Sequence, residues 1–145
     1  MSFRCEYKYI VEVSKLSELY KWLNFNKAKK IYPNRKITSV YFDNENYSIF
    51  KDSEEGVTPR KKIRIRFYNS FFAEAVDFNL EIKINSFEGR YKIVKKNTEI
   101  QVNDMINNGF LDSIYGICKF RSIVAYHRSY YKYSKYRITV DNNIQ

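Results

Sequence analysis

The sequence has little of several residue types on which small proteins often depend. Among 145 residues there are two cysteines, two prolines, four glycines and one histidine. Cys5 and Cys118 can form at most one disulfide and match no metal-ligand spacing, so we expect free thiols in a reducing cytoplasm. The scarcity of glycine and proline excludes collagen-like and linker-like chains. A run of about 20 apolar residues, as a transmembrane helix needs, is also missing from the sequence.

Positive charge and aromatic rings are what the sequence has instead. Lysine and arginine number 26 against 16 acidic residues, a formal net charge of +10, and aromatic residues make up 18%. Hydrophobic residues reach 44%, which excludes a disordered basic tail. The length suits one domain, residues 1–145. The charge predicts a polyanionic partner, which would be nucleic acid, an acidic membrane surface or a phosphorylated ligand.

Alternation of polar and apolar residues dominates the chain and predicts an antiparallel α+β fold that tends towards a barrel. Short helices are expected after a candidate N-cap at Ser14, within Asn44–Thr58 and within Val102–Cys118, with a loop at Asn24–Arg35. The predicted strands are Phe3–Val13, Lys36–Asp43, Arg60–Tyr68, Phe78–Ile84, Arg90–Lys96, Phe120–Tyr131 and Tyr136–Asp141.

Each predicted strand has a polar and an apolar side, because successive residues point to opposite faces. Like charges opposite one another across strands are each unfavourable by about 0.2–1 kcal/mol, so a face of one sign needs counter-charge. A bound polyanion would supply it, whereas a solvated outer face is the alternative interpretation. The polar sides hold eleven cations and three acids, namely Arg4, Lys8, Arg60, Lys62, Arg64, Arg66, Lys83, Arg90, Lys92, Arg128 and Arg137 with Glu6, Glu81 and Asp141.

The glutamates among these cations have two interpretations. Glu6 and Glu81 could hold a divalent cation, Mn²⁺ or Mg²⁺, because Mg²⁺ takes one or two carboxylates together with phosphate oxygens. A salt bridge from each glutamate to a neighbouring arginine is the alternative. A closed sheet with this polar side inside would focus its field on an anion of phosphate character, which arginine forks suit.

Six short segments carry a further signal. They are Arg4-Cys-Glu6-Tyr-Lys8-Tyr9, Ser39-Val-Tyr-Phe-Asp43, the basic stretch Gly56–Tyr68, Leu80-Glu81-Ile82-Lys83 (with Lys92 or Lys95 as the lysine that follows), Tyr126-His-Arg128 and Arg137-Ile-Thr-Val-Asp141. In this order they resemble the polyphosphate-polymerase (VTC) branch of the triphosphate tunnel metalloenzyme, or CYTH-like, superfamily. Each segment alone is weak, whereas six in the order of the family are specific.

The resemblance implies a tunnel-shaped antiparallel barrel whose basic interior binds ATP and polyphosphate with a divalent cation. It also implies transfer of the γ-phosphoryl group of ATP to a polyphosphate chain. Arg4 replaces the first glutamate of the E-x-E-x-K start of the hydrolase and cyclase branches, which favours the polymerase branch. The resemblance assigns catalysis to Lys8, Arg64, Arg66 and Lys83, phosphate binding to Arg4, Arg60, Lys62, Lys92, Lys95, Arg128 and Arg137, and the metal to Glu6 and Glu81.

Other functions stay open beside a polymerase. Family members continue into further strands after the R-x-T-x-D strand, so we expect a barrel that is incomplete at the C-terminus or is completed by a partner chain or by self-association. The alternatives are a non-catalytic polyphosphate- or triphosphate-binding module and a triphosphate hydrolase of the same fold. Nucleic acid is disfavoured, because no RNP-type, zinc-finger or helix-turn-helix signature is present. We expect a cytoplasmic protein, with the cytoplasmic face of a membrane, reached through a partner, as a second location.

Overall fold

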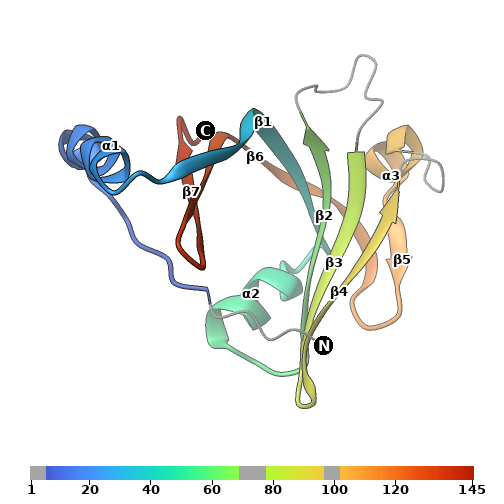
Figure 1. Ribbon diagram of the computed structural model, residues 1–145. Coiled ribbons are helices and arrows are strands. Elements are labelled where there is room, and N and C mark those ends of the chain that lie inside the picture. The colour runs from blue at the N-terminus through green and yellow to red at the C-terminus, as the bar shows by residue number, and fades with distance from the viewer. Residues whose placement is uncertain (1–5, 69–77, 97–101) are drawn as a thin grey trace. The chain divides into compact units, whose positions relative to one another are not determined.

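The computed structural model describes residues 6–68, 78–96 and 102–145, and its ribbon is shown in Figure 1. The fold of these residues is α+β with antiparallel strand pairing, as the sequence predicts. A 3₁₀ turn at Val13–Lys15 precedes the first helix. The elements are α1 (Leu16–Phe25), β1 (Lys29–Asp43), α2 (Ser48–Glu55), β2 (Arg60–Tyr68), β3 (Phe78–Ser86), β4 (Gly89–Lys96), α3 (Val102–Asn108), β5 (Phe110–Asp112), β6 (Gly116–Tyr133) and β7 (Tyr136–Asn142).

The described strands form one sheet in the order β4-β3-β2-β1-β6-β5, and β7 pairs with β6. Its centre is β2, which pairs antiparallel with β1 on one side and with β3 on the other. Ile63 of β2 lies opposite Phe42 of β1 and opposite Ile82 of β3. This register fixes which side chains share a face across three strands.

The chain divides into two compact units. The larger unit is Asn34–Arg128 with Val140–Gln145, and the smaller unit is Met1–Pro33 with Ser129–Thr139. Aromatic rings hold the smaller unit together. Trp22 of α1 packs edge-on against Tyr133 at 5.4 Å between ring centroids, and Tyr32 packs against Tyr130 at 5.5 Å. Tyr130 and Tyr133 of β6 therefore serve packing within the smaller unit.

The core of the larger unit uses the apolar half of the β2 alternation. Ile63, Ile65 and Phe67 are buried with Val40 and Phe42 of β1. The helix α2 contributes buried Ile49 to the same core, and α3 contributes partly buried side chains. Because alternate residues point to opposite faces, the cations of β2 are directed away from this core.

One ion pair fastens the apolar side of the sheet. Lys61 donates from Nζ to both carboxylate oxygens of Asp112, at 3.1 and 2.8 Å. Asp112 is 8% exposed and also accepts hydrogen bonds from the backbone N–H groups of Ile114 and Tyr115. Burial raises the pKa of Asp112, but the hydrogen bonds and the Lys61 charge lower it by more than burial raises it. The pKa of Asp112 therefore lies below its ordinary value. The pair attaches the β5–β6 turn to β2.

Several predicted elements differ from the observed ones. Residues 6–12 form no helix or strand, so the predicted strand Phe3–Val13 is wrong over these residues, and its first residues lie outside the described part. Tyr7 and Tyr9 are 78% and 82% exposed. Within the described residues no strand pairs with this segment, and alternation produces a strand only where a neighbour accepts the backbone hydrogen bonds.

The predicted loop Asn24–Arg35 is also wrong, because α1 runs to Phe25 and β1 begins at Lys29. The first half of β1 is mostly exposed and contains Pro33, so it lacks the apolar alternation that marks a strand. The stretch predicted as helical after α3 contains the strand β5, and Ser14 lies in the 3₁₀ turn instead of capping α1. None of the described helices has both the length and the apolar character needed to cross a bilayer.

Candidate functional site

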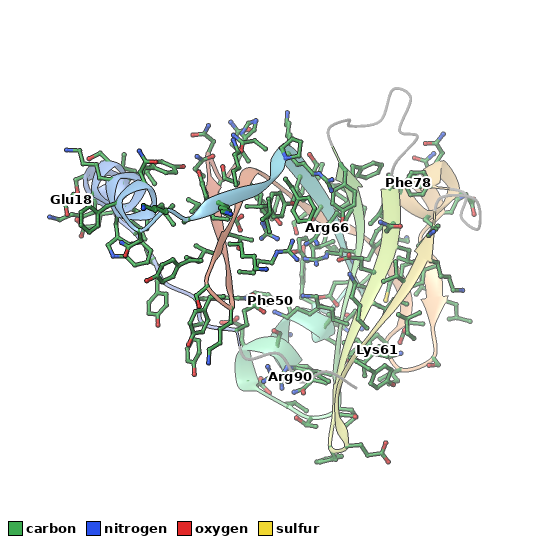
Figure 2. All side chains as sticks on the ribbon, viewed as in Figure 1. Glu18, Phe50, Lys61, Arg66, Phe78 and Arg90 are labelled. Atoms are coloured by element: carbon green, nitrogen blue, oxygen red, sulfur yellow. The ribbon has the colours of Figure 1, made fainter. Side chains whose placement is uncertain are left out.

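Cations occupy every second position of β2. Arg60, Lys62, Arg64 and Arg66 alternate with the side of the strand that faces the core. Figure 2 shows Arg66 and Lys61 on opposite sides of β2, with α2 on the side of Arg66. Directly opposed residues of antiparallel strands share a face, so the register extends this side across β3 and β4. We call it the basic face, with the charged residues Arg60, Lys62, Arg64, Arg66, Glu81, Lys83, Arg90, Lys92 and Lys96.

The register places like charges in rows across the basic face. Lys62 lies opposite Lys83, and Lys83 lies opposite Lys92. Only in the next row is a cation opposed by an acid, where Arg64 lies opposite Glu81. On the described strands β2–β4, eight cations thus share the face with one carboxylate. Such a face has a strong preference for anions.

Glu81 is the counter-ion of the basic face and is only 1% exposed. Its Oε2 accepts hydrogen bonds from Nε and Nη2 of Arg64, at 2.8 and 2.6 Å. Nη1 of Arg66 lies 3.4 Å from the same oxygen, and Nζ of Lys92 donates to Oε1. One carboxylate therefore holds three cations, from β2 and β4, in fixed positions. The predicted salt bridge to a neighbouring arginine is confirmed for Glu81.

The electrostatics of the cluster keep Glu81 and Arg64 charged. Burial raises the pKa of Glu81, but the Lys92 hydrogen bond and the charges of Arg64 and Arg66 outweigh burial, so its pKa lies below the ordinary value. Burial lowers the pKa of Arg64, whereas Tyr41 and Glu81 raise it, with a net rise. Glu81 therefore stays ionised at neutral pH and continues to orient its partners.

Side chains of β1 orient the two arginines further. Nη1 of Arg64 donates to Oη of Tyr41 at 3.0 Å, and the guanidinium lies 5.9 Å from the centroid of that ring. Nε of Arg66 lies 3.5 Å from Oγ of Ser39. Sequence reasoning missed these positioning roles, although both residues belong to the Ser39-Val-Tyr-Phe-Asp43 segment. The polar parity of that strand, aligned with β2, is the signal that would have revealed them.

Arg128 of β6 makes a paired contact of its own. Its Nε and Nη2 donate to the two carboxylate oxygens of Asp141, each at 2.6 Å, and its guanidinium lies 5.1 Å from the centroid of the Tyr126 ring. Burial raises the pKa of Tyr126, while the charges of Arg66 and Arg128 lower it, with a net rise. Tyr126 is thus within electrostatic reach of both arginines.

The other predicted residues of the larger unit differ in where their side chains lie. Lys62 and Lys83 are exposed on the basic face. Arg60 is also on this face, but its Nη1 donates to the carbonyl groups of Gly56 and Val57, so it closes the loop after α2. Lys95 lies opposite Leu80, on the core side of β3, and its neighbour Lys96 takes the place on the basic face. The register between β3 and β4 decides this difference of one residue.

The remaining predicted residues belong to other parts of the chain. Arg4 lies outside the described residues. Glu6 and Lys8 are exposed in the segment 6–12 of the smaller unit. Arg137, in the same unit, lies 5.6 and 5.4 Å from the ring centroids of Tyr32 and Tyr130. The basic face, as defined above, consists of residues of the larger unit.

The metal role of Glu6 and Glu81 stays a prediction, and in this structure the carboxylate of Glu81 is engaged by cations instead. Both oxygens of Glu81 are engaged by cations, and a divalent ion bound there would add positive charge beside three others. Across residues 6–68, 78–96 and 102–145, no group of three histidine, cysteine, aspartate or glutamate side chains is placed to hold a metal ion. We therefore assign Glu81 the role of positioning the cations that surround it.

Comparison with known families identifies the family of this chain. The VTC domain family model matches residues 3–117. The match covers most of the 145 residues, so the chain belongs to the VTC domain family, whose function concerns polyphosphate. The matched span contains the whole basic face, while Arg128 and Arg137 lie beyond it. A comparison with curated proteins finds no match.

Proposed function

We propose that this chain binds ATP and polyphosphate on the basic face and transfers the γ-phosphoryl group of ATP to the polyphosphate chain. The observation that carries the proposal is the buried Glu81, which fixes Arg64, Arg66 and Lys92 without neutralising the face. Phosphoryl transfer needs mainly alignment and charge stabilisation, and fixed guanidinium groups provide both.

The transfer itself needs no protein nucleophile. A terminal oxygen of the polyphosphate attacks the γ-phosphorus of ATP, and a new P–O–P bond forms. The bond between this phosphorus and the bridging oxygen breaks, and its electron pair leaves with ADP. In this scheme Arg64 and Arg66 donate hydrogen bonds to oxygens of the transferred group, while Lys62 and Lys83 hold the neighbouring phosphates. Glu81 acts through the arginines and does not touch the reacting atoms.

A divalent cation, Mn²⁺ or Mg²⁺, remains part of the proposal for turnover. Such a cation would neutralise charge on the leaving diphosphate. Because Glu81 is committed to its three cations, we assign no residue described here as its ligand, and the cation would then bind mainly through phosphate oxygens.

A matched pair of lysine variants tests the proposal. The full-length chain is incubated with ATP and Mn²⁺ or Mg²⁺, and polyphosphate is separated on a gel and stained. We expect long-chain product from the wild type and from Lys95→Gln, whose side chain lies on the other face of the sheet, and at least tenfold less from Lys62→Gln. Absence of product from folded wild type, or equal loss in the two variants, contradicts the proposal.

A non-catalytic binding module is the second candidate, and the commitment of Glu81 to cations favours it. Calorimetric titration with tripolyphosphate separates it from the enzyme, since tight binding without turnover selects the module. A triphosphate hydrolase of the same fold would instead release inorganic phosphate from tripolyphosphate, which a colorimetric phosphate assay detects.

A further inference from the structure

The helix α1, in the smaller unit, exposes aromatic rings on its outer side. Leu16, Leu19 and Leu23 recur at helical spacing and are partly or fully buried, so they mark the inner side. Phe25 and Trp22 lie on the other side of the helix and are 86% and 45% exposed. Residues three apart on a helix are surface neighbours, so the two rings form one exposed aromatic patch.

Positive charge accompanies this patch. Residues 15–30 contain five lysines and one glutamate, all exposed, which gives the stretch a net charge of +4. The glutamate is Glu18, which forms an ion pair with Lys15 at 3.1 Å. Lys21 lies four residues before Phe25 and is therefore its neighbour on the helix surface. Cationic and aromatic side chains thus share the outer side of α1.

The turn after α1 keeps three further lysines at the end of the helix, Lys27, Lys29 and Lys30. The N–H of Ala28 donates to the carbonyl of Leu23 at 2.9 Å, and Nδ2 of Asn26 donates to the carbonyl of Trp22, also at 2.9 Å. The strand β1 begins directly after this turn. The lysines that follow the helix therefore lie close to Phe25.

Trp22 is held in one position while much of it remains accessible. Its ring packs edge-on against Tyr133 at 5.4 Å between centroids. Tryptophan is enriched where a membrane meets water, because its ring is apolar and its N–H is a hydrogen-bond donor. Val13, in the 3₁₀ turn before α1, is 89% exposed and adds an aliphatic side chain to the same region of the sequence.

This combination favours a lipid surface as the partner. Single exposed apolar residues are common on proteins, but a helix with rings and lysines together on its outer side is typical of helices that lie in a membrane interface. The apolar side chains enter the boundary of the acyl chains, while the lysines reach the lipid phosphates. A nucleic acid would offer phosphates and stacking bases but no apolar environment for Val13.

We propose that the outer side of α1, with Val13 before it and the lysines after it, binds the surface of an anionic lipid bilayer. The helix lies in the plane of the membrane, Phe25 and Trp22 insert between lipids, and the lysines contact lipid phosphates. The proposal goes beyond the proposed function and uses no residue of the basic face.

Vesicle flotation and tryptophan fluorescence test this proposal on the full-length chain. Trp22 is the single tryptophan of the sequence, so its emission reports on α1 directly. The chain is mixed with vesicles of phosphatidylcholine alone, or of phosphatidylcholine and phosphatidylserine in equal parts. We expect flotation with the anionic vesicles, together with a shift of the Trp22 emission to shorter wavelength, and neither effect with the neutral vesicles.

Matched variants locate the contact. Phe25→Ser should weaken binding to the anionic vesicles about tenfold, because an apolar ring no longer inserts. Lys21→Gln should weaken it about fivefold, the usual effect of one lysine near an anionic membrane. The controls are Phe87→Ser and Lys51→Gln, the same changes at exposed positions of the larger unit, and they should bind as the wild type does. Thermal melting checks that each variant is folded.

Several results would overturn the proposal. Failure of the folded chain to float with anionic vesicles, or equal flotation with both kinds of vesicle, contradicts it. Flotation without a shift of the Trp22 emission, or equal weakening by Phe25→Ser and Phe87→Ser, would mean that another surface meets the lipid. A Trp22 shift with a single-stranded oligonucleotide but none with anionic vesicles would assign the outer side of α1 to nucleic acid.

Discussion

Replacing Glu81 by glutamine tests whether one buried carboxylate organises the basic face. The substitution keeps the size of the side chain and one acceptor oxygen but removes the charge that holds Arg64, Arg66 and Lys92. The three cations then face one another without a counter-ion. We expect the folded chain to lose stability and the two arginines to lose their fixed orientation.

The size of the effect follows from the geometry. Two unit charges 2.6 Å apart, as in the Arg64–Glu81 pair, attract by about 6 kcal/mol at an effective dielectric constant of about 20. The desolvation of the buried carboxylate offsets part of this attraction, and Lys92, 40% exposed at its side chain, adds little. We therefore expect the free energy of unfolding to fall by about 3 kcal/mol.

Urea denaturation in phosphate-free buffer measures this loss, and tripolyphosphate gives the second readout. With one negative charge removed, the variant should bind tripolyphosphate about tenfold more tightly, which returns about 1.4 kcal/mol of stability relative to the wild type at saturation. Phosphoryl transfer should fall at the same time, because transfer needs oriented arginines while binding needs only charge.

The control is Glu88→Gln, the same chemical change at an exposed position in the β3–β4 turn. It should leave unfolding and tripolyphosphate affinity unchanged. A Glu81→Gln variant as stable as the wild type in phosphate-free buffer would refute the counter-ion role. Weaker binding of tripolyphosphate to that variant would show that orientation, and not net charge, governs affinity.

Acid titration tests the same carboxylate in the wild type. The pKa of Glu81 in the folded chain lies below its ordinary value of 4.5. The contribution of the ionised carboxylate to stability is therefore complete above about pH 4.5 and is lost as the pH falls through the folded pKa. The urea midpoint should drop more steeply below about pH 4.5 in the wild type than in Glu81→Gln, and parallel curves would contradict this. On the core side, Asp112→Asn should lower the free energy of unfolding by about 2–3 kcal/mol, because Lys61 loses its buried partner. Tripolyphosphate affinity, measured by titration, should not change in that variant, and a large change would mean that the two sides of β2 are coupled.

The sequence predicted the basic strand well because its alternation is unbroken. The observed bounds of β2 are those predicted, Arg60–Tyr68, and the cations and aliphatic residues lie on opposite sides as their parity requires. The membership of Lys83 and Lys92 in the same face also follows from parity. The expectation that such a face needs counter-charge is met in part by Glu81.

Contacts that depend on the register between paired strands could not be predicted from the sequence. Parity does not say which acid meets which cation, so the three-way clamp around Glu81 appears only once β2, β3 and β4 are aligned. The same register moves Lys95 to the other side. The segment 6–12 was misread because strand pairing is a property of two segments.

The alternation of β2 has a consequence for how the gene can change. Its apolar and cationic halves are interleaved residue by residue, so the loss or gain of a single codon within this strand exchanges the two sides beyond that point. Guanidinium groups would then enter the space of Ile63, Ile65 and Phe67 in the core, and apolar side chains would lie on the basic face. Insertions and deletions among natural relatives should therefore be confined to the turns on either side of β2. Substitutions within the strand should keep apolar residues at the core-facing positions and polar residues at the alternate positions.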